Sequence, residues 1–229
     1  MTDAPLPRGR LLTLIVARFG LMFIIMGLMF FLPAGSLRYW QGWLWIGTLL
    51  VPMLFTLRYL LLHDPALLER RMRLREREQT QKRVQQFGWL YLLVTFMLPG
   101  FDYRFSWSHV PTGVVLAAAA VMLLSYGLFV LVLRENSYAS RVVEVAQGQK
   151  VIQSGPYAIV RHPMYVAVFG IYLASPLVLG SYWALIPAAL IVPIIIMRIL
   201  NEERMLREEL PGYAEYTRKV RHRLLPGIW

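Results

Sequence analysis

Residues 164–200 read MYVAVFGIYLASPLVLGSYWALIPAALIVPIIIMRIL, and Arg198 is the one charged residue in this stretch. The stretch is too long for a single membrane crossing, because about 20 apolar residues already span roughly 30 Å of hydrocarbon. Residues 180–182, Gly-Ser-Tyr, lie near its middle and favour a tight turn. We therefore predict a helical hairpin over residues 163–200 that enters and leaves a membrane on the same side.

Apolar stretches of similar character precede this hairpin, each bounded by polar residues, Gly or Pro. The whole chain is 57% hydrophobic and only 16% charged, with a mean hydropathy of +0.50. A soluble domain of this size does not need so much apolar surface, whereas membrane spans do. We predict an all-α, polytopic membrane helical bundle of about six transmembrane helices. The first four spans are about residues 11–32, 43–62, 87–101 (or, with an extension, 87–107) and 111–133.

The net charge of +11 is distributed in a way that orients these spans. Lys and Arg concentrate in the N-terminal tail and in segments 63–86, 134–161 and 198–229, whereas the alternate loops are nearly bare. Cytoplasmic loops of membrane proteins carry this excess. We predict a multi-pass protein of a bacterial inner membrane with both termini cytoplasmic. Because the charge is spread over several loops, we predict no nucleic-acid partner.

Residue types commonly used to bind metals are scarce in this sequence. The chain has no cysteine, which excludes disulfides and thiolate chemistry. Its histidines, at 63, 109, 162 and 222, are not spaced as pairs of metal ligands on one helix. We therefore predict no metal site.

The polar loop 134–162 leads directly into the hairpin. It leaves the fourth span as Arg134-Glu135-Asn136-Ser137-Tyr138 and ends in Arg161-His162-Pro163. Pro163 suits the first turn of a helix, where its missing N–H costs nothing. We expect the free backbone N–H groups of that turn, with Arg161 and His162, to form a positively polarised rim.

Glu202 and Glu203 follow the hairpin directly. We interpret them as lying at a helix end, where carboxylates are unfavourable for the helix dipole and would serve better as acceptors for a ligand. Because the hairpin returns to its starting side, His162 and Glu202 should meet at its mouth. The alternatives are an ordinary helix start for Arg161-His162-Pro163 and solvated surface charge for the glutamates.

An ordered set of short motifs in this region resembles the isoprenylcysteine carboxyl methyltransferase family. Phospholipid N-methyltransferases share the paired glutamates and the hairpin. The resemblance covers about residues 134–229, with two departures: Tyr213 follows Gly212 directly, and residues 220–223 read Val-Arg-His-Arg. The motifs are Gly155-Pro156-Tyr157, Arg161-His162-Pro163-Met164-Tyr165, Glu202-Glu203, Gly212-Tyr213 with Tyr216, and Arg223-Leu224-Leu225-Pro226.

The resemblance implies a pocket for S-adenosylmethionine (SAM), with S-adenosylhomocysteine (SAH) as product, at the cytoplasmic membrane face. It implies catalytic roles for His162, Glu202 and Arg223, and contacts of the acceptor with Asn136, Tyr138 and Arg223. Carboxylates and aromatic rings suit the sulfonium of SAM. The implied cofactor-binding residues are Gly155, Tyr157, Arg161, His162, Pro163, Tyr165, Glu202, Glu203, Tyr213 and Tyr216.

The same reading divides the chain into two regions. Residues 1–133 would hold four transmembrane helices with the basic cytoplasmic segment 63–86. Residues 134–229 would form the SAM-binding region, made of loop 134–162, hairpin 163–200 and an amphipathic segment 201–229. The sequence does not define the oligomeric state.

The acceptor implied by the resemblance is a lipid or another lipophilic small molecule, prenylated or not, that arrives from the bilayer. A carboxylate acceptor is favoured because it is already ionised, whereas an amine or a thiol would need His162 or Glu202 as a base. One alternative is a membrane sterol-type reductase that uses NADPH and holds its 2′-phosphate with Arg221, His222 and Arg223. A non-enzymatic transporter or adaptor is the other.

Overall fold

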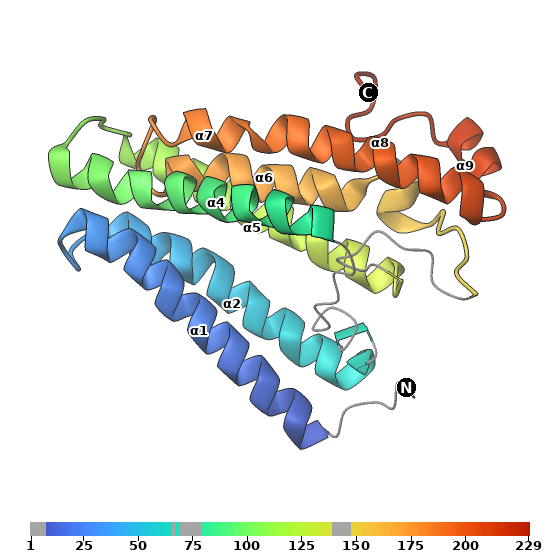
Figure 1. The fold of residues 1–229 in the computed structure, drawn as a ribbon, viewed down its shortest axis with the longest axis horizontal. Coiled ribbons are helices and arrows are strands. Elements are labelled where there is room, and N and C mark those ends of the chain that lie inside the picture. Colours follow the sequence, from blue (N-terminus) through green and yellow to red (C-terminus); the bar gives the residue numbers. More distant parts are fainter. Residues whose placement is uncertain (1–7, 66, 69–78, 139–147) are drawn as a thin grey trace.

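The computed structural model describes residues 8–65, 67–68, 79–138 and 148–229, with the backbone alone at residues 8, 10–12 and 79–90 (Figure 1). The described residues contain helices and loops but no strand, so the predicted all-α class is confirmed. The long helices are α1 (Arg8–Ala34), α2 (Trp40–His63), α4 (Gln79–Phe105), α5 (Thr112–Glu135), α6 (Pro163–Val178) and α8 (Ile191–Glu209). The short ones are the 3₁₀ helix η1 (Gly155–Ala158), α7 (Leu185–Ala189) and α9 (Tyr213–Lys219).

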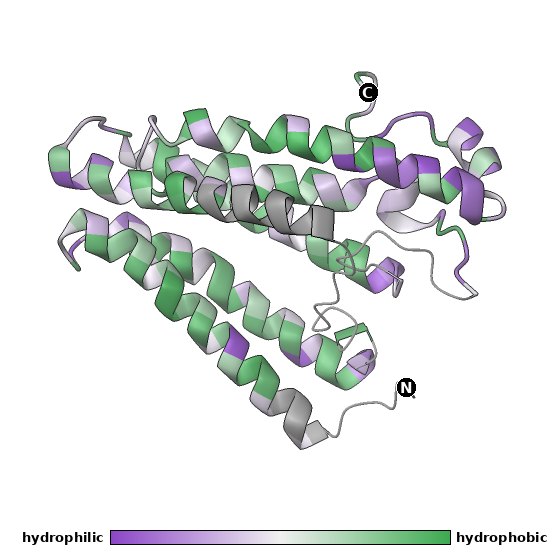
Figure 2. Cartoon of the chain, in the orientation of Figure 1, coloured by the Kyte–Doolittle hydropathy of each residue, from purple (hydrophilic) through white to green (hydrophobic). Residues whose placement is uncertain are grey.

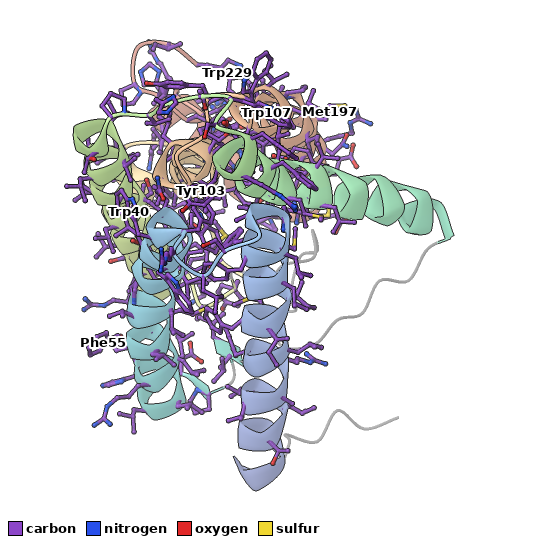
Figure 3. The ribbon with its side chains drawn as sticks, turned by 90° about the vertical axis from the view of Figure 1, so that its left-hand side faces the viewer. Trp40, Phe55, Tyr103, Trp107, Met197 and Trp229 are labelled. Atoms are coloured by element: carbon purple, nitrogen blue, oxygen red, sulfur yellow. The ribbon has the colours of Figure 1, made fainter. Side chains whose placement is uncertain are left out.

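Four of the helical stretches are long and apolar enough to cross a membrane, and α6 is a shorter apolar helix. Hydrophobic residues make up much of these helices (Figure 2). Phe55 on α2, for example, is 71% exposed and points outward (Figure 3). Such a surface suits lipid rather than water. The count of six spans stays a prediction; the four stretches are Thr13–Ala34, Trp40–His63, Thr112–Glu135 and Leu185–Glu209.

The hairpin forms where the sequence predicts it, but its second arm is longer than expected. The chain turns after α6 at Gly180, whose φ of +73° is a conformation that favours glycine. It then runs back as α7 and α8 beside α6 (Figure 1). We expected this arm to end near residue 200, yet α8 continues to Glu209. The helix continues because no helix breaker occurs before residues 210–212, Leu-Pro-Gly.

The third span also differs from its predicted bounds. The structure starts α4 at Gln79 rather than near residue 87, and ends it at Phe105. The last part of the basic segment 63–86 is therefore helical. Residues 69–78 of that segment lie outside the described residues.

Small residues let the helices approach closely at two contacts. A Cβ atom added at Gly170 of α6 would lie 1.9 Å from the Ser125 hydroxyl oxygen of α5. A Cβ at Gly100 of α4 would lie 2.7 Å from the Phe30 carbonyl oxygen of α1. Membrane helices associate largely through such close packing. Lipid tails are as apolar as the side chains, so the hydrophobic effect does not drive the helices together. These contacts fix α5 against α6 and α1 against α4.

One end of the bundle is closed by a buried carboxylate. Asp102 of α4 accepts hydrogen bonds from the backbone N–H and the hydroxyl of Ser108, at 2.7 and 2.6 Å, and from the hydroxyl of Ser181. The Tyr39 hydroxyl donates to the Leu179 carbonyl nearby. The short connections after α1, α4 and α6 are thereby joined. Trp40, Tyr103 and Trp107 gather at this end, as expected of an interfacial aromatic belt (Figure 3).

Successive long helices run in opposite directions, so the other end collects the remaining connections. The ends of α2 and α5, the start of α6, and the elements η1 and α9 all lie there (Figure 1). The polar loops singled out in the sequence therefore share one end of the bundle. Which side of the membrane this end faces remains a prediction from the Lys and Arg distribution.

Cysteine labelling should distinguish the two ends of the bundle. The natural chain has no cysteine, so each introduced cysteine is the one that reacts. Single cysteines at the exposed positions Leu37 and Trp183 should react with an impermeant maleimide in intact cells. Cysteines at Ser137 and Glu209, at the opposite end, should react only after permeabilisation. The cysteine-free parent is the control for background. Labelling of Leu37→Cys and Ser137→Cys from the same side would contradict this arrangement.

Candidate active site

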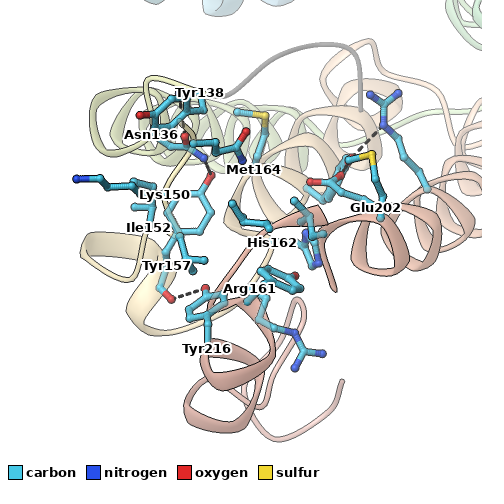
Figure 4. Close-up of a pocket in the computed structure, with 18 residues that line it drawn as sticks. Asn136, Tyr138, Lys150, Ile152, Tyr157, Arg161, His162, Met164, Glu202 and Tyr216 are labelled. Atoms are coloured by element: carbon cyan, nitrogen blue, oxygen red, sulfur yellow. Dashed lines mark hydrogen bonds between the residues drawn. The ribbon is translucent and has the colours of Figure 1, made fainter. Parts of the chain in front are cut away.

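A cavity opens at the end of the bundle where α5 stops and α6 begins (Figure 4). The space between its walls, including the open mouth, is about 870 Å³. Its walls come from the α5 exit, the loop before η1, the start of α6, the second half of α8, and α9. The lining residues are Asn136, Tyr138, Gln149, Lys150, Val151, Ile152, Tyr157, Arg161, His162, Met164, Tyr165, Arg198, Glu202, Met205, Leu206, Leu210, Tyr213 and Tyr216.

Residues at the C-terminal end of α5 bond to the loop that forms one wall of the cavity. Asn136 donates from Nδ2 to the Tyr157 hydroxyl at 2.9 Å and accepts from the Tyr138 N–H at 3.0 Å (Figure 4). Beside it, the Ser154 hydroxyl donates to Glu135 at 2.7 Å. A Cβ at Gly155 would lie 2.7 Å from the Glu135 side chain, and the φ of Gly155 is +55°. Only glycine fits this turn without strain.

Three tyrosines bring aromatic surface to the cavity. The Tyr216 hydroxyl donates to the Tyr157 carbonyl at 2.7 Å, which ties α9 to η1. Burial, opposed in part by the hydrogen bond from Asn136, raises the pKa of Tyr157 to about 12. Burial also raises the pKa values of Tyr213 and Tyr216. All three hydroxyls therefore stay neutral at physiological pH.

Tyr213 has a buried hydroxyl with no hydrogen-bond partner within the described part of the chain. Its side chain lines the cavity, and the residue is 4% exposed. Leaving a buried hydroxyl unsatisfied costs on the order of 1–3 kcal/mol, so such groups usually have a partner. A ligand in the cavity could provide one.

Glu202 faces the same cavity from α8. It accepts a hydrogen bond from the Tyr165 hydroxyl at 2.6 Å, and that hydroxyl accepts one from Arg198 Nε at 2.9 Å. The three side chains form a line from Arg198 through Tyr165 to the carboxylate. Tyr165 thus holds Glu202 in one orientation at the cavity wall.

Glu203, the next residue, lies on a different side of α8 and is 3% exposed. Its Oε1 is 2.7 Å from Arg161 Nε and 3.2 Å from His162 Nε2, and its Oε2 is 3.1 Å from Arg223 Nε. Arg161 also donates to the Val220 carbonyl at 3.2 Å. A buried carboxylate is tolerated only with this kind of pairing. Glu203 therefore joins α8, the start of α6 and the C-terminal segment.

The C-terminal segment bonds to the backbone just before α6. The Arg161 N–H donates to the His222 carbonyl and the His162 N–H to the Arg223 carbonyl, both at 2.9 Å. The C-terminal segment thus occupies the two backbone N–H groups that precede the first turn of α6. The positively polarised rim expected from the N–H groups of that turn, with Arg161 and His162, stays a prediction.

The structure divides the residues predicted for the site into two groups. Gly155, Pro163, Glu203 and Arg223 do not line the cavity, and Glu203 and Arg223 bind each other. The glutamates also lie inside α8 rather than at its end, so the argument from the helix dipole does not apply. The predicted residues that line the cavity are Asn136, Tyr138, Tyr157, Arg161, His162, Tyr165, Glu202, Tyr213 and Tyr216.

Several lining residues were missed by the sequence reasoning. Arg198, Met205 and Leu206 lie four before, three after and four after Glu202, and residues at these spacings share a helix face. That periodicity was a usable signal once α8 was known to continue. Lys150 and Ile152 come from the loop before η1, where no periodic pattern marks which side chains turn inward.

The metal prediction concerns this site as well. Among the described residues, no group of three or more His, Cys, Asp or Glu side chains is arranged to hold a metal ion. The polar groups of the cavity are instead a carboxylate, an imidazole, two guanidinium groups, an ammonium group, two amides and tyrosine hydroxyls. Such a set suits an organic molecule with both charged and aromatic parts.

Replacing Glu203 should be strongly destabilising. Glu203→Ala leaves Arg161 buried without its partner, and breaking a buried ion pair typically costs about 3–5 kcal/mol. Thermal unfolding in detergent measures the loss, and Glu208→Ala, at an exposed position of the same helix, should cost under about 0.5 kcal/mol. Equal melting temperatures for the two variants would show that the cluster does not hold the fold together.

Comparison with known proteins identifies the region that contains this site. Residues 113–211 match the family model described as phospholipid methyltransferase. No curated protein matches the chain at a significant level. The matched residues run from the start of α5 to just past the end of α8, and they include most of the cavity wall. This region of the chain is therefore similar to the phospholipid methyltransferase family.

Proposed function

We propose that this protein is a SAM-dependent methyltransferase that modifies a lipid-soluble acceptor at the cytoplasmic membrane face. The observation that carries the proposal is the cavity, which combines Glu202 with several tyrosines inside the region matched to the methyltransferase family. The lipid-exposed helices around it support an acceptor that arrives from the bilayer. The basic loops at this end of the chain support the cytoplasmic placement.

The side chains of the cavity fit a sulfonium cofactor. Aromatic faces and a carboxylate attract a positive centre, and Tyr157, Tyr216 and Glu202 provide both. The Tyr213 hydroxyl, which has no partner among the described residues, could bond to a polar group of the ligand. The Arg161 guanidinium, whose Nε is held by Glu203, and the adjacent His162 imidazole offer polar groups suited to the carboxylate of an amino acid moiety. When bound, SAM would supply the methyl group through its sulfonium.

The chain itself would act mainly by positioning. Methyl transfer to a carboxylate needs no base, so alignment and exclusion of water supply most of the rate. Glu203 fixes Arg161 and His162, and Tyr165 fixes Glu202, so these walls are set before a ligand binds. The carboxylate remains our preferred acceptor. An amine or thiol would require His162 or Glu202 to take a proton.

The reductase alternative finds less support in this geometry. It requires Arg221, His222 and Arg223 to face the 2′-phosphate of NADPH. None of the three lines the cavity, and Arg223 is bound to Glu203 and lies over the Trp229 ring at 5.0 Å. A methyltransferase region at residues 134–229, supported by helices from residues 1–133, agrees better with the cavity walls. Because the family match begins at residue 113, α5 belongs functionally with this region in our proposal.

Glu202→Gln should weaken binding of SAH, measured by calorimetry in detergent with EDTA present. A charge-assisted contact in a partly desolvated pocket is worth roughly 1.5–3 kcal/mol, which corresponds to about ten- to a hundredfold in affinity. Glu208→Gln, on the exposed face of α8, is the matched control and should bind as the wild type does. Wild-type affinity in Glu202→Gln, or dependence of SAH binding on a metal, would contradict the proposed site.

Tyr213→Phe separates a ligand-binding role of Tyr213 from a structural one. Because the hydroxyl lacks a partner in the described residues, its removal should leave the melting temperature unchanged or raise it. The same change should lower SAH affinity by about two- to tenfold, the value of one neutral hydrogen bond of roughly 0.5–1.5 kcal/mol. Tyr216→Phe removes a hydroxyl that is bonded to Tyr157 and should lower the melting temperature instead. Unchanged SAH affinity in Tyr213→Phe would remove that hydroxyl from the site.

A further inference from the structure

A second cavity lies at the opposite end of the bundle, where α2 and α5 begin and α4 and α6 end (Figure 1). The space between its walls, including the open mouth, is about 590 Å³. Tyr39 and Gln41 line it at the start of α2, Tyr103 lines it on α4, Ser108 lies just beyond α4, and Leu179 follows α6. The proposed methyltransferase function does not use this cavity.

Gln41 brings a buried amide oxygen to the second cavity. Its Oε1 is shielded from solvent and has no hydrogen-bond partner among the described residues. On the nitrogen side of the amide, a Cβ added at Gly180 would lie 3.1 Å from Nε2, so the turn after α6 confines the side chain. A buried acceptor without a donor is costly, and such groups usually have a partner. A ligand with an N–H or O–H group would supply that donor.

Two hydroxyls of the same cavity have already donated their protons within the protein. Tyr39 donates to the Leu179 carbonyl, and Ser108 donates to Asp102 at 2.6 Å. A hydroxyl has one proton and two lone pairs, so both oxygens can still accept a hydrogen bond but cannot donate another. With the Gln41 oxygen, the cavity therefore presents three side-chain oxygens that suit a donor.

A buried negative charge lies directly behind the hydroxyl of Ser108. Asp102 is fully buried, and its hydrogen bonds come from the neutral groups of Ser108 and Ser181. Among the described residues, no basic side chain forms an ion pair with Asp102, whereas Glu203 at the other end has several. Burying a carboxylate without a cation nearby is unfavourable. A positively charged ligand in the cavity would offset this charge.

Aromatic side chains also favour a cation at this position. The Tyr39 and Tyr103 rings both line the cavity, with their centroids 4.7 Å apart, and tyrosine rings attract cations. The helix dipoles do not alter this preference, because two helices begin and two end around the cavity. Trp40 and Trp107, which are 40% and 51% exposed, lie at the same end (Figure 3). Such an aromatic belt marks the depth of lipid head groups.

We propose that the second cavity binds a primary ammonium group carried by a lipid head group. An ammonium group has three N–H donors and no acceptor, which matches the oxygens of Gln41, Tyr39 and Ser108. Arg38 and Arg104 are exposed at the same end and do not line the cavity, so they suit the phosphate of the same head group. The bound lipid would join the connections that surround the cavity. This site is separate from the cavity at Glu202 and does not depend on the methyltransferase proposal.

The experiment compares ligands that differ in their N–H groups. Native mass spectrometry of the protein in detergent measures binding of dihexanoyl phosphatidylethanolamine, dihexanoyl phosphatidylcholine and ethanolamine. Phosphatidylethanolamine should bind at least about tenfold more tightly than phosphatidylcholine, whose trimethylated nitrogen has no N–H to donate. Gln41→Glu should raise the affinity for phosphatidylethanolamine by about tenfold, and Gln41→Lys should abolish the preference.

Two control variants separate this site from other effects of charge. Thr112→Glu adds a carboxylate at an exposed position of the same end, outside the cavity, and should bind as the wild type does. Glu202→Gln alters the other cavity and should leave the preference for phosphatidylethanolamine unchanged. Melting temperatures show whether each variant is folded, and misfolding would not produce the increase in affinity expected for Gln41→Glu.

Each outcome decides whether the second cavity binds an ammonium group. Equal affinity of the wild type for the two lipids would overturn the proposal, as would wild-type binding in both Gln41 variants. Loss of the preference in Glu202→Gln would place the ammonium group in the other cavity and would also overturn it. Ethanolamine binding as tight as that of phosphatidylethanolamine, and sensitive to Gln41→Lys, would support the ammonium site and assign its ligand to soluble amines.

Discussion

The carboxylate of Glu203 is the contact on which the site depends. Burying an unpaired carboxylate costs several kcal/mol, so Glu203 is tolerated only because Arg161, His162 and Arg223 surround it. These partners come from the start of α6 and from the C-terminal segment, far apart in sequence. The carboxylate therefore joins α6, α8 and the chain beyond α9 at one point. This point lies directly behind the cavity wall.

The neighbouring Glu202 shows how one helix can serve structure and binding at once. Consecutive residues of an α-helix are turned by about 100°, so adjacent side chains face different surroundings. Glu203 turns into the protein, and Glu202 turns into the cavity, where Tyr165 orients it. A rigid charged cluster behind a ligand-facing side chain helps to hold a binding site in shape. The pair of glutamates thus combines a support with a candidate ligand contact.

The two ends of the bundle use buried carboxylates differently. At one end, Asp102 accepts hydrogen bonds from hydroxyl and N–H groups of two loops. These bonds link the short connections at that end of the bundle. Glu203 is paired with cations, and the neighbouring cavity remains open. Between the ends, small residues such as Gly170 allow α5 and α6 to pack closely. The close packing of α5 on α6 aligns the α5 exit, with Asn136, beside His162 at the start of α6.

The sequence by itself determined the helical membrane class and the hairpin, because apolar length and a central turn are local properties. It also placed the polar clusters at one end, since a hairpin returns its chain to the starting side. The sequence could not show that Glu203 and Arg223 bind each other behind the cavity, or that the Arg161 and His162 N–H groups are taken by the C-terminal segment. Those contacts join residues far apart in sequence. A sequence motif gives the residue types but does not say which way each side chain points. Only the tertiary structure decided that Glu202 and Arg198 share the cavity while Glu203 supports it, because the rotation of α8 against α6 sets which face of the helix turns inward.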